Sequence, residues 1–96
     1  MYAFEPIPAN LPPANEKYIL GPQANLWAEW VPSLEHAEYM MFPRACALAE
    51  VGWSSKSSRN WEDFVQRLKI QAQRFDVMGV NYRHAAIESP EPNLLK

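Results

Sequence analysis

The strongest helix signal in this 96-residue chain lies in residues 60–79, which read NWEDFVQRLKIQAQRFDVMG. Apolar side chains recur there at helical spacing, at Phe64, Val65, Leu68, Ala72 and Phe75. Such spacing is typical of a helix with one buried face. Asn60 is a preferred N-cap residue, and Gly79 is typical of the position that follows a helix C-terminus. The pattern predicts an amphipathic helix over residues 61–78.

A second helical pattern covers residues 34–53. Ser33 can cap it, and Glu35 lies in the first turn, where the positive end of the helix dipole favours a carboxylate. Pro43 interrupts the pattern, and because proline lacks a backbone N–H we expect a kink there. The Ala-rich run that follows Pro43 suits a helix packed closely on several sides.

The N-terminal part of the chain does not have a helical pattern. Residues 1–17 contain four prolines, which are unfavourable inside helices and central strands, so we expect an extended connector with a turn near Asn15. The apolar stretch 19–27 is broken by Gly21-Pro22 and predicts a bend into a buried strand over residues 23–27. A lone strand leaves backbone N–H and C=O groups unpaired. The strand therefore pairs with something else or belongs to a larger sheet.

Composition excludes several classes of protein. Nine Lys and Arg against eleven Asp and Glu give a net charge of −2, which argues against a nucleic-acid-binding protein. One cysteine excludes an intramolecular disulfide, and with two histidines we expect no metal site and no cofactor. No apolar run approaches the ~20 residues of a membrane span, and no signal peptide is visible. The length allows at most one small domain.

The densest candidate for chemistry is Trp27-Ala28-Glu29-Trp30. On an extended backbone, Trp27 and Glu29 would point to the same face. An aromatic wall beside a carboxylate fits a sugar, whose C–H face packs on indole and whose hydroxyls donate to the carboxylate. The alternative is that both tryptophans belong to the core and that Glu29 is a solvated loop acid.

An ordered series of blocks resembles the C-terminal end of glycoside hydrolase family 20, the β-N-acetylhexosaminidases. The blocks are GPQANLWAEW (21–30), EYMMFPRA (38–45), ALAEVGWS (47–54), WEDF (61–64) and GVNYR (79–83). The resemblance extends over roughly residues 2–83, and the succession of blocks is more specific than any one of them.

The resemblance implies a place for each segment in a (β/α)₈ barrel. It makes residues 1–83 a C-terminal fragment of the catalytic domain, followed by a tail at 84–96. Residues 19–27 correspond to the last strand, 34–53 to the helix that follows it, and 61–78 to a terminal helix outside the barrel. As an isolated fragment, the chain should be mainly α, with two to three helices and one short strand or extended segment.

The resemblance also implies an activity for the parent protein. Family members release terminal β-linked GlcNAc or GalNAc with retention, and the substrate's own acetamido oxygen attacks the anomeric carbon. An Asp-Glu pair assists, but no such pair occurs in this sequence, so the chain should contain no catalytic residue. What carries over is Trp27 as a wall of the sugar pocket and Glu29 as acceptor for the O4 and O6 hydroxyls.

Three other residues have structural interpretations. Arg44 and Glu50 are six residues apart on the second helical segment and cannot form an i,i+4 pair. Each is expected to anchor loop or strand-end carbonyls around the rim of the barrel. Cys46 lies in an apolar run and is interpreted as an inert buried thiol.

Another class of protein stays open: a stand-alone helical binding or interaction module without catalysis. For a fragment freed of its barrel we expect an exposed apolar patch that includes Leu26, Leu48, Val51 and Trp53, and hence a homo-oligomer or dependence on a partner. Glycan-active relatives are often exported, so the resemblance favours an extracytoplasmic location.

Overall fold

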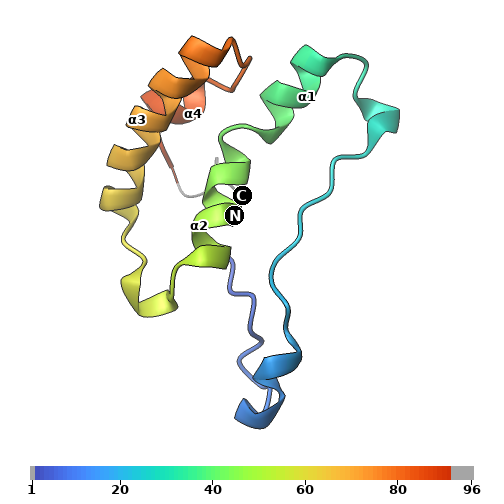
Figure 1. The fold of residues 1–96 in the computed structure, drawn as a ribbon, viewed down its shortest axis with the longest axis vertical. Coiled ribbons are helices and arrows are strands. Elements are labelled where there is room, and N and C mark those ends of the chain that lie inside the picture. The colour runs from blue at the N-terminus through green and yellow to red at the C-terminus, as the bar shows by residue number, and fades with distance from the viewer. Residues whose placement is uncertain (1, 92–96) are drawn as a thin grey trace.

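The structure, a computed structural model, describes residues 2–91 and is mainly α-helical, as predicted. Helices α1 to α4 and three short 3₁₀ helices follow one another along the chain (Figure 1). Their bounds are Pro13–Tyr18 (η1), Ala28–Trp30 (η2), Leu34–Met41 (α1), Arg44–Trp53 (α2), Lys56–Ser58 (η3), Trp61–Met78 (α3) and Ala85–Glu88 (α4). Within residues 2–91 no strand is formed.

Helix α3 has the bounds that the sequence predicts. The Asn60 side chain accepts a hydrogen bond from the Asp63 backbone N–H at 2.9 Å, which satisfies one of the free donors at the helix start. Gly79 ends the helix with φ of 71°, a left-handed conformation that glycine adopts without steric cost. Local sequence signals therefore fix both ends.

The core forms where α3 lies against α2 and α4. One cluster joins Ala47 of α2 with Phe64 and Leu68 of α3 and Ala86 of α4. A second cluster joins Ala72 and Phe75 to Tyr82, which follows the helix. The whole predicted stripe of α3 is buried. Alanine at positions 47 and 86 leaves room for the aromatic rings because its side chain is a single methyl group.

The structure differs from the sequence-based expectations at two places in this core. Helix α4 lies in the predicted tail at 84–96, and its Ala86 is 1% exposed. Residues 92–96 of that tail lie outside the described residues. Val51, expected on an exposed patch, is only 3% exposed. It faces the interior because it lies one helical turn beyond Ala47 on the same face of α2.

The predicted kinked helix over 34–53 is two helices. Phe42 caps α1 in an extended conformation, with φ of −106° and ψ of 135°, as expected for a residue before proline. Pro43 is almost fully buried, and the Phe42–Pro43 peptide bond is cis. The chain thus breaks where a kink was expected, and α1 and α2 point in different directions in Figure 1.

The expected buried strand over 23–27 is an exposed extended segment. Residues 19–27 leave η1 and run back toward η2 as an arm (Figure 1), and Leu26 is 39% exposed. Gly21 forms the expected bend with φ of 148°. The expectation of burial was wrong for the chain as described because no neighbouring strand lies beside the arm within residues 2–91. The expected turn near Asn15 is η1.

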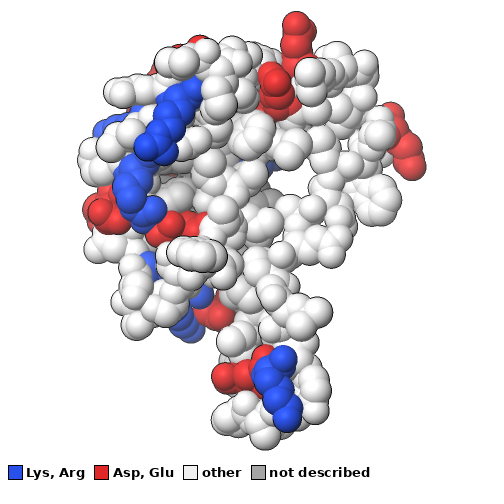
Figure 2. Space-filling view, in the orientation of Figure 1, with Lys and Arg blue, Asp and Glu red and all other residues white. Residues whose placement is uncertain are grey.

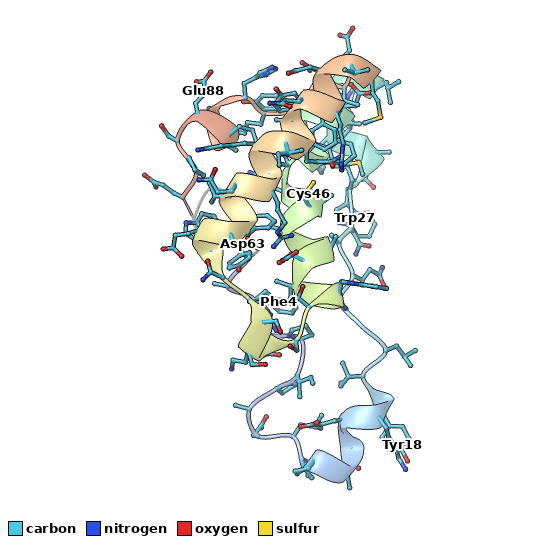
Figure 3. The ribbon with its side chains drawn as sticks, turned by 60° about the vertical axis from the view of Figure 1, so that its left-hand side comes forward. Phe4, Tyr18, Trp27, Cys46, Asp63 and Glu88 are labelled. Atoms are coloured by element: carbon cyan, nitrogen blue, oxygen red, sulfur yellow. The ribbon has the colours of Figure 1, made fainter. Side chains whose placement is uncertain are left out.

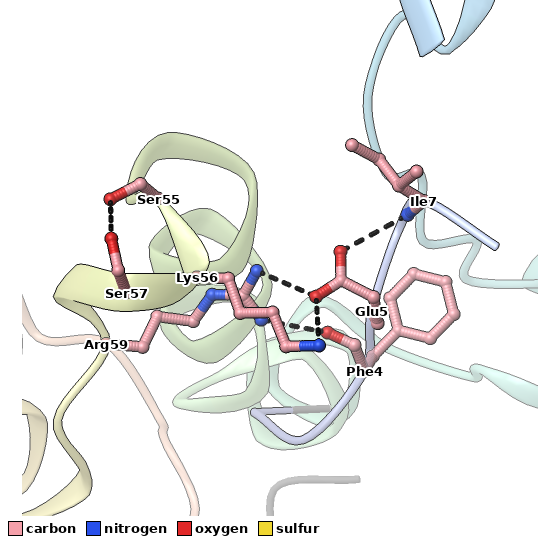
Figure 4. Close-up of polar contacts among 7 residues, drawn as sticks. All are labelled: Phe4, Glu5, Ile7, Ser55, Lys56, Ser57 and Arg59. Atoms are coloured by element: carbon pink, nitrogen blue, oxygen red, sulfur yellow. Dashed lines mark hydrogen bonds and ion pairs between the residues drawn. The ribbon is translucent and has the colours of Figure 1, made fainter. Parts of the chain in front are cut away.

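The N-terminal connector is held on the α2–α3 corner. The Tyr2 ring lies 5.0 Å from the ring centre of Trp61 and 4.9 Å from that of Phe64. Arg59 donates to the Phe4 carbonyl and to a Glu5 carboxylate oxygen, each at 3.3 Å (Figure 4). The start and the C-terminal half of the chain therefore form one unit.

We predict that Asn60→Ala lowers the free energy of unfolding of the 96-residue chain by about 1 kcal/mol, because the N-cap bond to Asp63 is lost. Urea unfolding followed by circular dichroism measures the change. Gln66→Ala, an exposed truncation on the same helix, is the control and should be neutral or slightly stabilising. Equal loss in both variants would contradict a capping role.

Candidate functional site

Trp27 and Glu29 lie where the arm ends and turns. Trp27 is still extended, with φ of −84° and ψ of 116°, and it caps η2. Glu29 is the middle residue of that 3₁₀ turn, and the Trp30 N–H donates to the Trp27 carbonyl at 3.3 Å. The extended backbone expected through Glu29 therefore stops at Trp27, so the alternation that would place both side chains on one face does not apply.

The turn presents its aromatic rings and its carboxylate to solvent. Trp27 is 67% and Trp30 80% exposed, so the interpretation of both tryptophans as core residues is wrong for the chain as described. Glu29 is also exposed, and no hydrogen bond or ion pair to its carboxylate is formed within residues 2–91. The turn can offer a ligand an indole surface and a free acceptor group.

The local sequence explains this turn. Pro32 follows η2 and cannot continue it, and Ser33 then begins α1 by accepting a hydrogen bond from the His36 N–H at 3.2 Å. A two-residue link to a capped helix thus holds the turn next to α1. Figure 3 labels Trp27, and the views of Figures 1 and 3 agree that α2 lies between this side of the molecule and α3.

A hollow of about 230 Å³ separates the end of the arm from the α1–α2 junction. Its lining is mostly apolar, with Leu26 from the arm and Met40 and Met41 from α1. Arg44 reaches the same hollow, and its Nε is buried without a hydrogen-bond partner in the described part of the chain. The rim role expected for Arg44 stays a prediction, since none of the described carbonyls accepts from it.

The role expected for Glu50 is wrong. Glu50 pairs with Arg67 of α3 through two hydrogen bonds, at 2.9 and 2.5 Å, beside a groove of about 470 Å³ between α2 and α3. Its side chain is 11% exposed. Hydrogen bonding to Arg67 is the main reason why the pKa of Glu50 lies below its ordinary value. Glu50 and Arg67 are 17 residues apart and lie on different helices, so their pairing leaves no local spacing signal in the sequence.

One part of this network could have been found from the sequence. Arg67 also donates to Asp63 at 2.8 Å, one helical turn earlier, and an acid four residues before a base is a known helix pair. The Arg67 guanidinium is thereby held by two carboxylates. The pair ties α2 to α3 and lies away from the Trp27 turn.

Cys46 fits the structural interpretation. It is half-buried on α2 (Figure 3), and burial raises the pKa of its thiol, which disfavours the nucleophilic thiolate. In the described residues no group of three His, Cys, Asp or Glu side chains is arranged to hold a metal ion. Likewise, none of the described helices is long and apolar enough to cross a membrane.

Comparison with known proteins defines the class. The model of the family described as "Glycosyl hydrolase family 20, catalytic domain" matches residues 1–56. This range includes the Trp27 turn, α1 and α2. The chain therefore belongs to glycoside hydrolase family 20, as the resemblance implied.

Individual relatives extend the similarity beyond residue 56. The chain is 39% identical over 90 residues to a "Beta-hexosaminidase" of Porphyromonas gingivalis, covering 94% of this chain and 12% of the relative. It is 41% identical over 75 residues to a "Beta-hexosaminidase" of Akkermansia muciniphila, covering 78% and 15%. A "Beta-N-acetylhexosaminidase" of Cellulomonas fimi is 32% identical over 76 residues, covering 79% and 15%. The chain thus spans about one-seventh or less of the length of these relatives.

We predict that Glu50→Gln makes the stability of the 96-residue chain less dependent on pH. Because the pKa of Glu50 is lowered in the folded chain, the pair stabilises the fold above the ordinary glutamate pKa, and this stabilisation is lost as pH falls through the folded-state pKa. The variant should lose roughly 1 kcal/mol at pH 7 and show a shallower decline in acid. Urea unfolding at pH 3 to 7 measures this.

The matched control for this prediction is Glu16→Gln, which removes an exposed carboxylate from η1. This control should follow the parent curve at every pH. A Glu50→Gln curve that also follows the parent would contradict the link between α2 and α3.

Proposed function

We propose that the chain is the C-terminal part of the catalytic domain of a β-N-acetylhexosaminidase and that it supplies one wall of the sugar pocket. One observation carries the proposal: an extended segment ends in an exposed turn, Trp27 to Trp30, that offers indole rings and a free carboxylate. In a parallel barrel, ligands bind just beyond the C-terminal ends of the strands. The turn has this position if residues 19–27 are a barrel strand.

The arm has the character of a strand that has lost its neighbours. Residues 18–28 contain no Lys, Arg, Asp or Glu, and the arm between η1 and η2 forms an uncharged surface in Figure 2. Leu20 is 98% exposed. Strands of parallel barrels are apolar because both of their faces are covered. If the remainder of the domain flanks the arm, it covers the exposed apolar side chains and pairs with the free backbone groups.

The substrate class follows from the family and the turn. The parent is proposed to release terminal, non-reducing β-linked GlcNAc or GalNAc, with the substrate's acetamido group as the internal nucleophile and with retention. Trp27 packs against the C–H face of the sugar. Glu29 accepts from O4 and O6 and so selects a terminal residue whose hydroxyls are free.

The catalytic groups are proposed to lie outside these 96 residues. An Asp-Glu pair is absent from the sequence; the nearest approach, Glu62-Asp63, is reversed and opens α3. One wall of a pocket binds sugar but supplies neither a proton nor stabilisation of the acetamido group. The isolated chain should therefore be inactive.

A further proposal concerns assembly of the isolated chain. Trp53 is 93%, Trp30 80% and Val77 90% exposed, so large apolar side chains face solvent on more than one element. Monomers rarely tolerate extensive apolar surface. The chain by itself is proposed to form homo-oligomers or to depend on a partner that covers these residues.

We expect light scattering of the isolated chain at high micromolar concentration to give a mass of at least two chains. A double variant, Leu20→Ser and Trp53→Ser, should shift the mass toward the monomer because it removes two of the most exposed apolar side chains. A single monomeric mass for the unchanged chain over the whole concentration range would contradict the assembly proposal.

For the function itself, we predict that Glu29→Gln in the full-length parent lowers kcat/KM for p-nitrophenyl-β-N-acetylglucosaminide by about 10- to 150-fold. The reason is the loss of charge-assisted acceptance from two hydroxyls, worth roughly 1.5–3 kcal/mol. Binding of a GlcNAc-type inhibitor should weaken as well, and the shape of the pH profile should stay the same.

The control is Glu16→Gln, distant in sequence and exposed on η1, and it should leave the kinetics unchanged. If Glu29 only braces the turn, Glu29→Gln will lower Tm and leave kcat/KM unchanged. Measured turnover by the isolated 96-residue chain, above that of a mock preparation, would contradict the assignment of the catalytic groups to the remainder of the domain.

A further inference from the structure

The arm that carries the Trp27 turn is not held by backbone hydrogen bonds in the described chain. From Leu20 to Leu26, neither N–H nor C=O groups of the backbone are paired within residues 2–91. Within residues 2–91 its course is therefore set by side-chain packing and by restricted dihedral angles, to which neighbouring strands of the proposed barrel would add backbone hydrogen bonds. Gly21, with φ of 148°, turns the chain into the arm, and the ring of Pro22 then fixes the next φ.

The two ends of the arm are packed differently against the helices. Near its start, Pro22 lies against the last turn of α2 at Gly52. A methyl group on the Gly52 Cα would lie 3.1 Å from Cγ and 3.3 Å from Cδ of Pro22. Near its end, at Ala24 to Leu26, the arm stands off from the helices and leaves the hollow of about 230 Å³. The close contact is thus at Pro22.

Only glycine permits this approach without displacement. A carbon-to-carbon distance of 3.1 Å is shorter than ordinary van der Waals contact, about 3.5–4.0 Å, so any larger residue at position 52 would push the arm and α2 apart by a few tenths of an ångström. Gly52 has a helical conformation without positive φ. A dihedral requirement therefore does not explain glycine here, whereas the close approach of Pro22 does.

We infer that Gly52 is a positioning residue for the sugar pocket: its contact with Pro22 sets the distance between α2 and the arm, and thereby the location of Trp27 and Glu29. The inference rests on the proposed function and goes beyond it, since Gly52 lies on α2 and outside the turn proposed to bind the sugar. Four residues of extended chain separate Pro22 from Trp27, so a displacement at the start of the arm is carried to the turn at its end.

The test is Gly52→Ala in the full-length parent protein. Alanine favours helix over glycine, so Tm should be unchanged or higher. KM for p-nitrophenyl-β-N-acetylglucosaminide should rise by about 3- to 10-fold, with kcat within about twofold, because small displacements of binding groups weaken binding appreciably. Higher stability together with weaker substrate binding is a combination that a merely structural role for Gly52 would not produce.

A second variant tests the contact directly. Pro22→Ala removes Cγ and Cδ, the two atoms that the new methyl group would meet. In the double variant, Gly52→Ala with Pro22→Ala, KM should return to within about twofold of the parent value, so the two changes are strongly non-additive. Gly79→Ala is the matched control: it places the same methyl group at a left-handed glycine with open space around it, and it should lower Tm without altering KM.

Each outcome decides the inference. Unchanged KM in Gly52→Ala overturns it, and so does a raised KM that Pro22→Ala fails to restore. Glu29→Gln, measured on the same substrate, separates this failure from failure of the proposed function. If Glu29→Gln weakens binding but Gly52→Ala does not, only the positioning role is lost. If the unchanged parent does not hydrolyse the substrate, both the function and the inference fail.

Discussion

The burial of one face of α3 against two alanines is the interaction on which the described structure depends. Phe64 and Leu68 pack on Ala47 of α2 and Ala86 of α4, and each large side chain buried in this way stabilises the fold by roughly 1.5–3 kcal/mol. Without α3, the inner face of α2 would be exposed to solvent. The Glu50–Arg67 pair then adds a directional link between the same two helices, which packing alone does not provide.

The arm and its turn obey a different constraint. Their residues have little to pack against within the described chain, and the backbone of the arm has no partners there. Exposure of Trp27 and Trp30 beside a free carboxylate is unfavourable in an isolated domain but useful at the edge of a binding pocket. Stability and candidate function thus lie on opposite sides of α2, joined through the contact of Pro22 with Gly52.

How much the sequence could predict depended on how local each feature is. Helix α3 was predicted to the residue because Asn60, Gly79 and the apolar stripe act within one segment. The prediction of a strand in the arm was wrong because a strand forms only beside another strand. The sequence of one segment does not specify whether such a neighbour is present. The Glu50–Arg67 pair was missed for the same reason, since it joins two helices. The assignment of Trp27 and Glu29 to a sugar site stays a prediction, and the extended backbone expected through Glu29 was wrong because a 3₁₀ turn begins at Ala28.

The packing of Tyr2 on Trp61 and Phe64 has a consequence for where the catalytic domain should be considered to end. The family model matches residues 1–56, yet most of the residues that hold Tyr2 and Glu5 lie beyond it: Arg59, Trp61 and Phe64, beside Lys56 at its edge. A boundary drawn at residue 56 would separate a binding surface from the segment bound to it. The stretch matched by the family model is therefore shorter than the packed physical unit, and any excised, fused or circularly permuted version of such a domain should keep α3 with it.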